Sequence, residues 1–365
     1  MAVCKTIRTK ESIVEFLIQS ENGDESVSAF KYADGKIEVH SLKTECAPLY
    51  LDEKTCVSLL SAEKFPSMLL AVTLKSNQVV EFRSWDVSGT QGFVSKDFQP
   101  SAETSSKKEL NGKPKFIFSL KNHVAKDEVT SSAFNISCSS YKDLLCLVLN
   151  GIVTLLFKLK LLESGNFVLE HRDTFKFAES SPATNIIHSI FLKGGQDKIY
   201  IAALEKQTIS LLTYENGKLD LMPNPVQWKG PPMTRLHRLT LSKCLIIDVQ
   251  GQLSLYSPPT EVVPLRLPSS TKGHSICSAI GFKYTNEGML AICNNDYTIN
   301  FYSLADILCS VTGNKNKATF VKPYRVFCSQ FPINAINFLK SDQLSMVSTG
   351  NQSITLLGGL SKGFS

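Results

Sequence analysis

The feature of this sequence that most restricts its fold is a short apolar pattern that recurs along its length. Each copy has two runs of β-branched or aromatic residues separated by a tight turn rich in Gly, Asn, Asp or Ser. Few long stretches carry apolar residues at helical spacing. A strand–turn–strand unit repeated in this way predicts an all-β repeat protein.

Seven such hairpins can be read in the 365 residues. Their turns fall at 34–35, 76–77, 150–151, 205–206, 250–251, 295–296 and 350–351. Asp-Gly and Asn-Gly suit two-residue hairpins because Gly and Asn accept a positive φ at little cost. The turns are 42 to 74 residues apart. A four-stranded propeller blade needs roughly 40–45 residues, so each hairpin fits the middle pair of a blade.

Other apolar runs supply the remaining strands of each unit. The expected inner strands are 12–19, 56–62, 129–137, 185–192, 233–241, 275–284 and 333–339. The last unit lacks a fourth strand, and the run at 3–8 can supply it, because propellers commonly close by letting an N-terminal strand complete the last blade. We therefore expect one all-β domain over 1–365, a closed seven-bladed β-propeller. Nothing in 361–365 looks like a designed chain end, and we expect the native protein to continue beyond Ser365.

The sixth unit carries the most specific motif. Gly273 and His274 precede its first strand, Asp296 lies in its turn, and Tyr302 stands near the end of its hairpin. This arrangement resembles a WD40 repeat, with Tyr302 in the place of the family's Trp. The resemblance implies a degenerate WD40-like propeller in which the His and the Asp belong to a structural hydrogen-bond network and have no catalytic role.

The other units keep less of this motif. The first retains a turn aspartate, Asp34, and the second retains a slightly displaced Trp-Asp pair at 85–86. The third, fourth, fifth and seventh units have neither Gly-His nor Trp-Asp. The resemblance therefore covers nearly the whole chain as a strand pattern but is specific in only one unit.

Two polar stretches, 99–116 and 311–318, interrupt the pattern, and we expect both to be surface loop insertions. Basic residues in and beside them are candidates to contact an acidic partner or an RNA backbone. These candidates are Lys107, Lys108, Lys113, Lys115, Lys315, Lys317, Lys322 and Arg325. Solvated loops that only keep the protein soluble are the simpler explanation. Tyr324, beside the second group, is either a base-stacking residue or an ordinary strand aromatic.

A Pro-rich segment at 223–233 contains Trp228, a further candidate contact. An exposed Trp can anchor a partner, whereas a buried one would only pack.

The sequence carries no catalytic motif. It has no Gly-rich phosphate loop, no H-E-x-x-H and no G-x-S-x-G. Its 6 His are scattered without ligand spacing, and none of its 10 Cys forms a C-x-x-C pair. We therefore expect no enzyme activity, no cofactor, no metal and no small-molecule substrate.

Charge and hydropathy indicate the setting. The N-terminus has no signal-peptide core, and no run approaches the roughly 20 apolar residues that span a bilayer, so we expect an intracellular, soluble protein without membrane insertion. The net charge of +6 is mildly basic and favours the nucleus or nucleolus over the cytoplasm.

These observations favour a non-enzymatic scaffold that binds other subunits of a multisubunit complex, of the ribosome-biogenesis type. A propeller subunit of a membrane-trafficking or coat complex is one alternative. A propeller that binds RNA directly through the basic loops is another.

Overall fold

Strands dominate the computed structural model, and the described part of the chain contains one helix, α2 (Leu304–Thr312). Contacts divide the chain into two units, Met1–Ala33 with Lys229–Ser365 and, second, Asp34–Trp228. The structure describes residues 2–8, 13–21, 24–32, 37–41, 49–51, 56–62, 64–75, 79–86, 94–96, 116–119, 136–149, 151, 153–161, 167–177, 186–194, 198–268, 273–279, 288–312, 320–338, 345–349 and 353–358.

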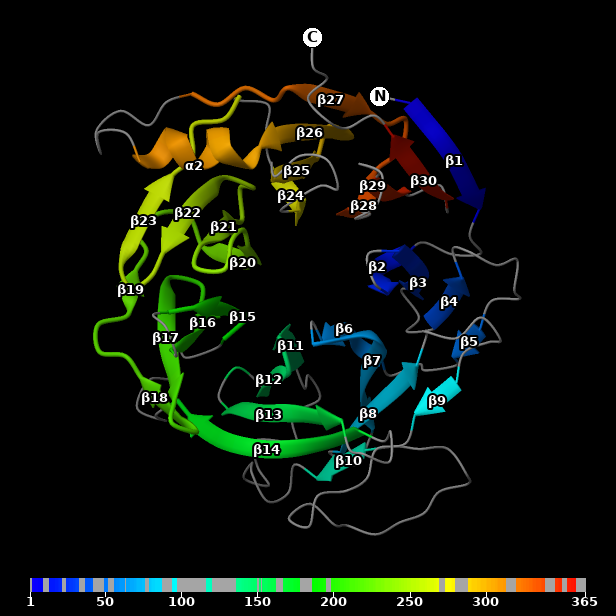
Figure 1. Cartoon of the computed structure of the whole chain (residues 1–365). Coiled ribbons are helices and arrows are strands. Elements are labelled where there is room, and N and C mark those ends of the chain that lie inside the picture. The colour runs from blue at the N-terminus through cyan, green and yellow to red at the C-terminus, as the bar shows by residue number, and fades with distance from the viewer. Residues whose placement is uncertain are drawn as a thin grey trace. The chain divides into compact units, whose positions relative to one another are not determined.

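The first unit contains three four-stranded antiparallel sheets, with orders β20-β21-β22-β23, β24-β25-β26-β27 and β1-β30-β29-β28 (Figure 1). Their strands are β20 (Met233–Arg238), β21 (Cys244–Asp248), β22 (Leu253–Ser257), β23 (Glu261–Pro264), β24 (Gly273–Ala279), β25 (Met289–Asn294), β26 (Thr298–Ser303), β27 (Arg325–Cys328), β28 (Ile333–Phe338), β29 (Ser345–Thr349), β30 (Ser353–Gly358) and β1 (Ala2–Arg8). The pair β2 (Ile13–Glu21) and β3 (Asp24–Tyr32) also belongs to this unit.

The two ends of the chain meet in one sheet. Strand β1 pairs antiparallel with β30, with Thr6 opposite Thr355 and Arg8 opposite Ser353. The strand predicted at 3–8 therefore completes the sheet of the last hairpin, as expected, and covers an edge of β30 that would otherwise be open to pairing. The number of blades remains a prediction.

The second unit contains three more antiparallel sheets and the pair β4 (Ile37–Ser41) and β5 (Leu49–Leu51). The sheets are built around β6-β7-β8, β11-β12-β13-β14 and β15-β16-β17-β18. Their strands are β6 (Cys56–Ala62), β7 (Phe65–Lys75), β8 (Val79–Asp86), β9 (Val94–Lys96), β10 (Phe116–Ser119), β11 (Ile136–Tyr141), β12 (Leu144–Leu149), β13 (Val153–Leu161), β14 (Phe167–Lys176), β15 (His188–Lys193), β16 (Ile199–Leu204), β17 (Thr208–Glu215), β18 (Lys218–Leu221) and β19 (Val226–Gln227).

The predicted insertion at 99–116 interrupts a single outer strand. Both β9 and β10 pair with β8, Lys96 opposite Ser84 and Phe116 opposite Phe82. The chain therefore leaves the edge of β8 opposite Ser84, at the end of β9, and returns opposite Phe82, two residues away on β8. Its last predicted residue, Phe116, begins β10, and 99–115 lie outside the described residues.

Two of the described hairpin turns have a positive φ at the predicted glycine. Gly251 has φ 75° and Gly151 has φ 69°, conformations that favour glycine. At the 250–251 turn, the Oδ1 atom of Asp248 accepts hydrogen bonds from the backbone amides of Gln250 and Gln252, each at 2.9 Å. The predicted turns at 34–35, 76–77 and 350–351 lie outside the described residues.

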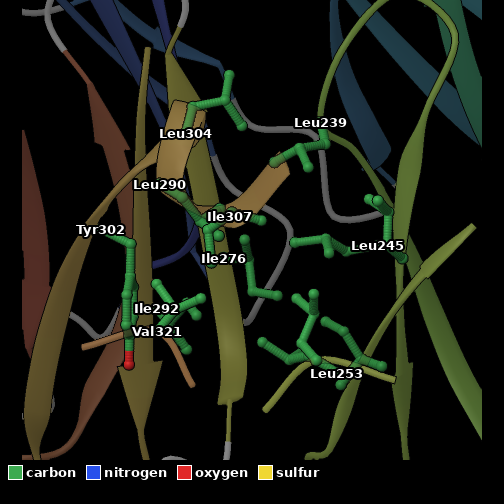
Figure 2. Close-up of a cluster of buried hydrophobic side chains, with 13 residues drawn as sticks. Leu239, Leu245, Leu253, Ile276, Leu290, Ile292, Tyr302, Leu304, Ile307 and Val321 are labelled. Atoms are coloured by element: carbon green, nitrogen blue, oxygen red, sulfur yellow. The ribbon is translucent and has the colours of Figure 1, made fainter. Parts of the chain in front are cut away.

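Strand β25 shows how the hairpins build the core. Alternate side chains of a strand point to opposite faces of the sheet. Leu290 and Ile292 accordingly join one buried cluster with β21, β22 and α2 (Figure 2). Met289, Ala291 and Cys293 join a second cluster with β28 and Leu357. Because β25 is buried on both faces, its sequence is a continuous apolar run.

The helix α2 was not predicted. Leu304 and Ile307 are buried in the first of these clusters, and Leu308 and Val311 pack against it. These apolar residues recur at helical spacing over only two turns, too short a stretch to outweigh the strand pattern around it. The surface loop predicted at 311–318 therefore begins inside α2, because Val311 and Thr312 are helical. Residues 313–319 lie outside the described residues.

The inner strand predicted at 129–137 overlaps the observed strand only at 136–137, and 129–135 lie outside the described residues. The strand that pairs with β12 is β11, which ends in a tight turn at Lys142 and Asp143, where Lys142 has φ 52°. The three serines in β11 conceal it, since they resemble a loop composition. The other six predicted inner strands overlap β2, β6, β15, β20, β24 and β28.

Candidate functional site

Gly273, the first residue of β24, stands where backbones and side chains approach closely. Its amide donates to the carbonyl oxygen of Gly251 at 2.9 Å. A Cβ atom built at Gly273 would lie 2.9 Å from Cγ2 of Ile292 and 3.6 Å from Cδ2 of Leu253. The position therefore has a packing reason to be glycine.

His274 and Asp296 make separate hydrogen bonds, which corrects the single network that the WD40 resemblance implied. The Nε2 atom of His274 lies 2.6 Å from the carbonyl oxygen of Ile333, on β28 of the neighbouring sheet. Asp296 accepts hydrogen bonds from the backbone amide of Thr298 at 3.1 Å and from its hydroxyl at 2.6 Å. The carboxylate is thus occupied by its own turn, while the imidazole reaches across to the next sheet.

Tyr302 takes the place of the family's Trp and is fully buried. It belongs to the cluster shown in Figure 2. The side-chain amide of Asn300 donates a hydrogen bond to the Tyr302 hydroxyl at 3.3 Å. Asp34 lies outside the described residues.

The turns between β25 and β26 and between β27 and β28 expose two aromatic side chains on the same end of their sheets. Tyr297 is 41% exposed and Phe331 is 42% exposed. The backbone amide of Ser329 donates to the carbonyl oxygen of Tyr297 at 2.9 Å. The hydroxyl of Ser329 accepts a hydrogen bond from the backbone amide of Phe331 at 3.1 Å. The first bond links the two turns, and the second lies within the turn between β27 and β28.

A third exposed apolar residue lies on the corresponding turn of the preceding sheet. Val249 is 58% exposed and donates its amide to the carbonyl oxygen of Pro232 at 2.8 Å. The same turn contacts β24 through Gly251 and Gly273, and Gly273 is paired with Asn294, which begins the turn of Tyr297. We call Val249, Tyr297 and Phe331 the turn-end surface.

Tyr297 has an unusual backbone conformation. Its φ is 66°, in the left-handed region that favours Gly and Asn. A bulky side chain there carries a conformational cost of about 1 kcal/mol or more. The ring remains 41% exposed, so the fold does not bury it fully. Sequence reasoning missed the residue, although an aromatic directly after an Asn-Asn-Asp turn is a readable signal.

The predicted basic contacts are only partly described. Lys322 is exposed, and Arg325 is half-buried at the start of β27. Tyr324 packs against the β25–β28 cluster, as an ordinary strand aromatic does. The remaining candidates, Lys107, Lys108, Lys113, Lys115, Lys315 and Lys317, lie outside the described residues. Their numbering places the first four in the second unit and the other two in the first unit.

Trp228 follows β19 at the end of the second unit. It is half-buried, and its backbone amide donates to the carbonyl oxygen of Gln207 at 2.8 Å. Its side chain is therefore partly packed and partly exposed.

Two of the described thiols, Cys146 and Cys244, are fully buried. Burial raises the pKa of the Cys146 thiol to about 12 and also raises that of Cys244, so both are protonated near neutral pH. No three His, Cys, Asp or Glu side chains among the described residues are grouped to hold a metal ion. No helix in the described part of the chain is long and apolar enough to cross a membrane.

Comparison with known proteins identifies the fold. The chain matches no protein-family model and no curated protein. It is similar to the crystal structure of BBS1N in complex with ARL6DN, with a TM-score of 0.59, 10% identity and coverage of 99% of this chain and 97% of that one. It is also similar to the β-propeller domain of Myceliophteria thermophila Cps50 (Swd1), with a TM-score of 0.57, 12% identity and coverage of 97% and 98%. The chain therefore has a β-propeller fold.

Proposed function

We propose that this chain is a non-enzymatic scaffold that binds protein subunits of a multisubunit complex through its turn-end surface. The observation that carries the proposal is the exposure of Tyr297 and Phe331 on two turns that are hydrogen-bonded to each other. Tyr is enriched among the residues that dominate protein–protein binding, because its ring buries a large area with few rotatable bonds.

The backbone of Tyr297 supports the same conclusion. A turn selected only for stability would carry Gly or Asn at a φ of 66°. Residues held in a sparsely populated conformation tend to cluster at functional sites. A partner that buries the ring supplies the free energy that the isolated fold lacks. The similar chain BBS1N was solved in complex with ARL6DN, which agrees with a propeller that holds a partner.

Affinity capture of the tagged chain from its native cells, followed by mass spectrometry with and without nuclease, tests the proposal. The test variant is Tyr297→Asn with Phe331→Ala, since Asn accepts a positive φ and adds no strain. The matched control is Leu241→Ala, because Leu241 is 51% exposed at the opposite end of β21 from Val249.

We expect a set of subunits that survives nuclease, is lost from the test variant and is retained by the control. Subunits lost on nuclease treatment would favour the RNA-binding alternative, and a chain recovered alone would contradict the scaffold. The identity of the subunits decides between a nuclear or nucleolar assembly, which the basic charge favours, and a trafficking or coat complex.

A further inference from the structure

The positive charge of the chain is concentrated in one region. Residues 229–365 contain 13 Lys and Arg against 6 Asp and Glu. Residues 34–228, which form the second unit, contain 22 of each. The remaining residues, 1–33, contain 4 Lys and Arg against 5 Asp and Glu. The net charge of +6 therefore comes entirely from the C-terminal part of the first unit.

Most described cations of the second unit form ion pairs, although Lys142, Lys176, Lys193 and Lys206 do not. In the second unit, Lys198 pairs with Glu215 at 3.3 Å and Lys218 with Asp220 at 3.1 Å. By contrast, five cations in the described part of 229–365 form no ion pair. They are Lys229, Arg235, Lys243, Arg266 and Lys322.

The 6 acidic residues of 229–365 are too few to balance its 13 basic residues, and the two turn aspartates are hydrogen-bonded within their own turns. Asp248 accepts from the amides of its own turn, and Asp296 accepts from Thr298. The region therefore presents net positive charge to any partner.

Two of these cations lie on backbone segments that contact each other. The amide of Val321 donates to the carbonyl oxygen of Arg266 at 3.0 Å. Leu265 and Val321 are buried in the cluster of Figure 2. Their neighbours Arg266, Phe320 and Lys322 are exposed, and Phe320 is 50% exposed. We call these three residues the basic rim.

The rim continues into β27 with the spacing of an extended chain. Along 320–328, the exposed residues are Phe320, Lys322, Val326 and Cys328, whereas Tyr324 packs inward. A period of two matches the spacing of side chains in an extended partner segment. Here the cation Lys322 lies between the exposed apolar residues Phe320 and Val326, so the complementary segment carries a carboxylate next to an apolar side chain.

We infer that the basic rim binds an extended acidic segment of a protein partner, with one apolar side chain packed on Phe320. The inference deepens the scaffold proposal and rests on it. The rim has two unpaired cations and a half-exposed ring, which suits a short acidic–apolar segment. A nucleic acid would need a longer line of cations that follows its backbone.

Selection of phage-displayed random peptides of about 12 residues on the immobilised full chain supplies the probe. The leading peptide, labelled with fluorescein, is then titrated by anisotropy. We expect the selected sequences to carry acidic residues beside an apolar one. We expect affinity to fall about tenfold or more in Arg266→Glu with Lys322→Glu, and about fivefold in Phe320→Ala.

The control is Lys198→Glu with Lys218→Glu, which changes the net charge equally but in the second unit. This control should bind the peptide like the wild type, as should the variant Tyr297→Asn with Phe331→Ala. Selected peptides without acidic enrichment would overturn the inference. So would a peptide affinity in Arg266→Glu with Lys322→Glu, the rim variant, equal to that of the wild type. A single-stranded RNA that outcompetes the peptide and loses affinity in the rim variant would also overturn it.

The capture experiment keeps the two proposals separate. Subunits captured by the wild type while no acidic peptide binds the rim would overturn this inference alone. Peptide binding without any captured subunit would overturn the scaffold proposal instead.

Discussion

A methyl group added at Gly273 is expected to destabilise the first unit. In an ordinary strand position, Gly→Ala stabilises by about 0.5–1 kcal/mol, because Gly loses more conformational entropy on folding. Here the new Cβ would lie 2.9 Å from Cγ2 of Ile292. Packed carbon atoms rest at about 3.5–4.0 Å, and Ile292 is fully buried and cannot move freely. Overpacking of a core costs about 1–3 kcal/mol. The steric term therefore wins by about 0.5–2 kcal/mol.

Thermal and urea denaturation of Gly273→Ala measure this loss, which corresponds to a decrease in Tm of roughly 2–6 °C. A double-mutant cycle identifies its cause. Ile292→Ala alone should cost about 2–5 kcal/mol, but in that background the methyl group at Gly273 should stabilise by about 0.5–1 kcal/mol, because only the entropic term is left. The expected coupling is about 1–3 kcal/mol. A stabilised Gly273→Ala, or strictly additive changes, would refute the contact with Ile292 as the reason for this glycine.

Three further changes test the remaining contacts. Asp248→Ala should lower the free energy of unfolding by about 1.5–3 kcal/mol and speed hydrogen exchange at its two turn amides, while Asp248→Asn, which keeps an acceptor, should lose less. The carboxylate of Asp173 accepts a hydrogen bond from the backbone amide of Leu219 on β18 at 2.6 Å, so Asp173→Ala should lower the free energy of unfolding by about 1–2 kcal/mol. The same variant should speed hydrogen exchange at the Leu219 amide, and unchanged protection there would contradict the contact. Burial raises the pKa of the Cys146 thiol from 9.0 to about 12, so the stability that is present below pH 9 is lost as the pH rises toward 12. The variant Cys146→Ala should therefore flatten the dependence of Tm on pH above about 9.

The hairpins were predictable because their signals are local. Strand β25 is a continuous apolar run, and burial of alternate residues in two clusters explains why it has to be one. The turn after β21 needs a residue of positive φ, which Gly251 supplies at the predicted place. The strand at 3–8 was found by a different argument, since an unpaired sheet edge at the end of the chain requires a partner.

Strand β11, which was predicted only at 136–137, and helix α2, which was not predicted, show where local patterns are insufficient. Strand β11 is polar in sequence and is a strand because β12 pairs with it along its whole length. The helix α2 is short, and its apolar face is stabilised by the cluster that it covers rather than by helix propensity. In both cases tertiary contacts, which no window of sequence contains, determine the conformation.

The candidate surfaces follow the same division. Tyr297 could have been singled out from the sequence, because an aromatic residue in a turn that favours Gly or Asn conflicts with its own backbone. Arg266 and Lys322 could not, because they are distant in sequence and adjoin only through the hydrogen bond between Val321 and Arg266. Their exposure depends in turn on the burial of Leu265 and Val321 in one cluster. The strand pattern therefore predicts which residues point outward, but the packing between sheets decides which outward residues form one surface.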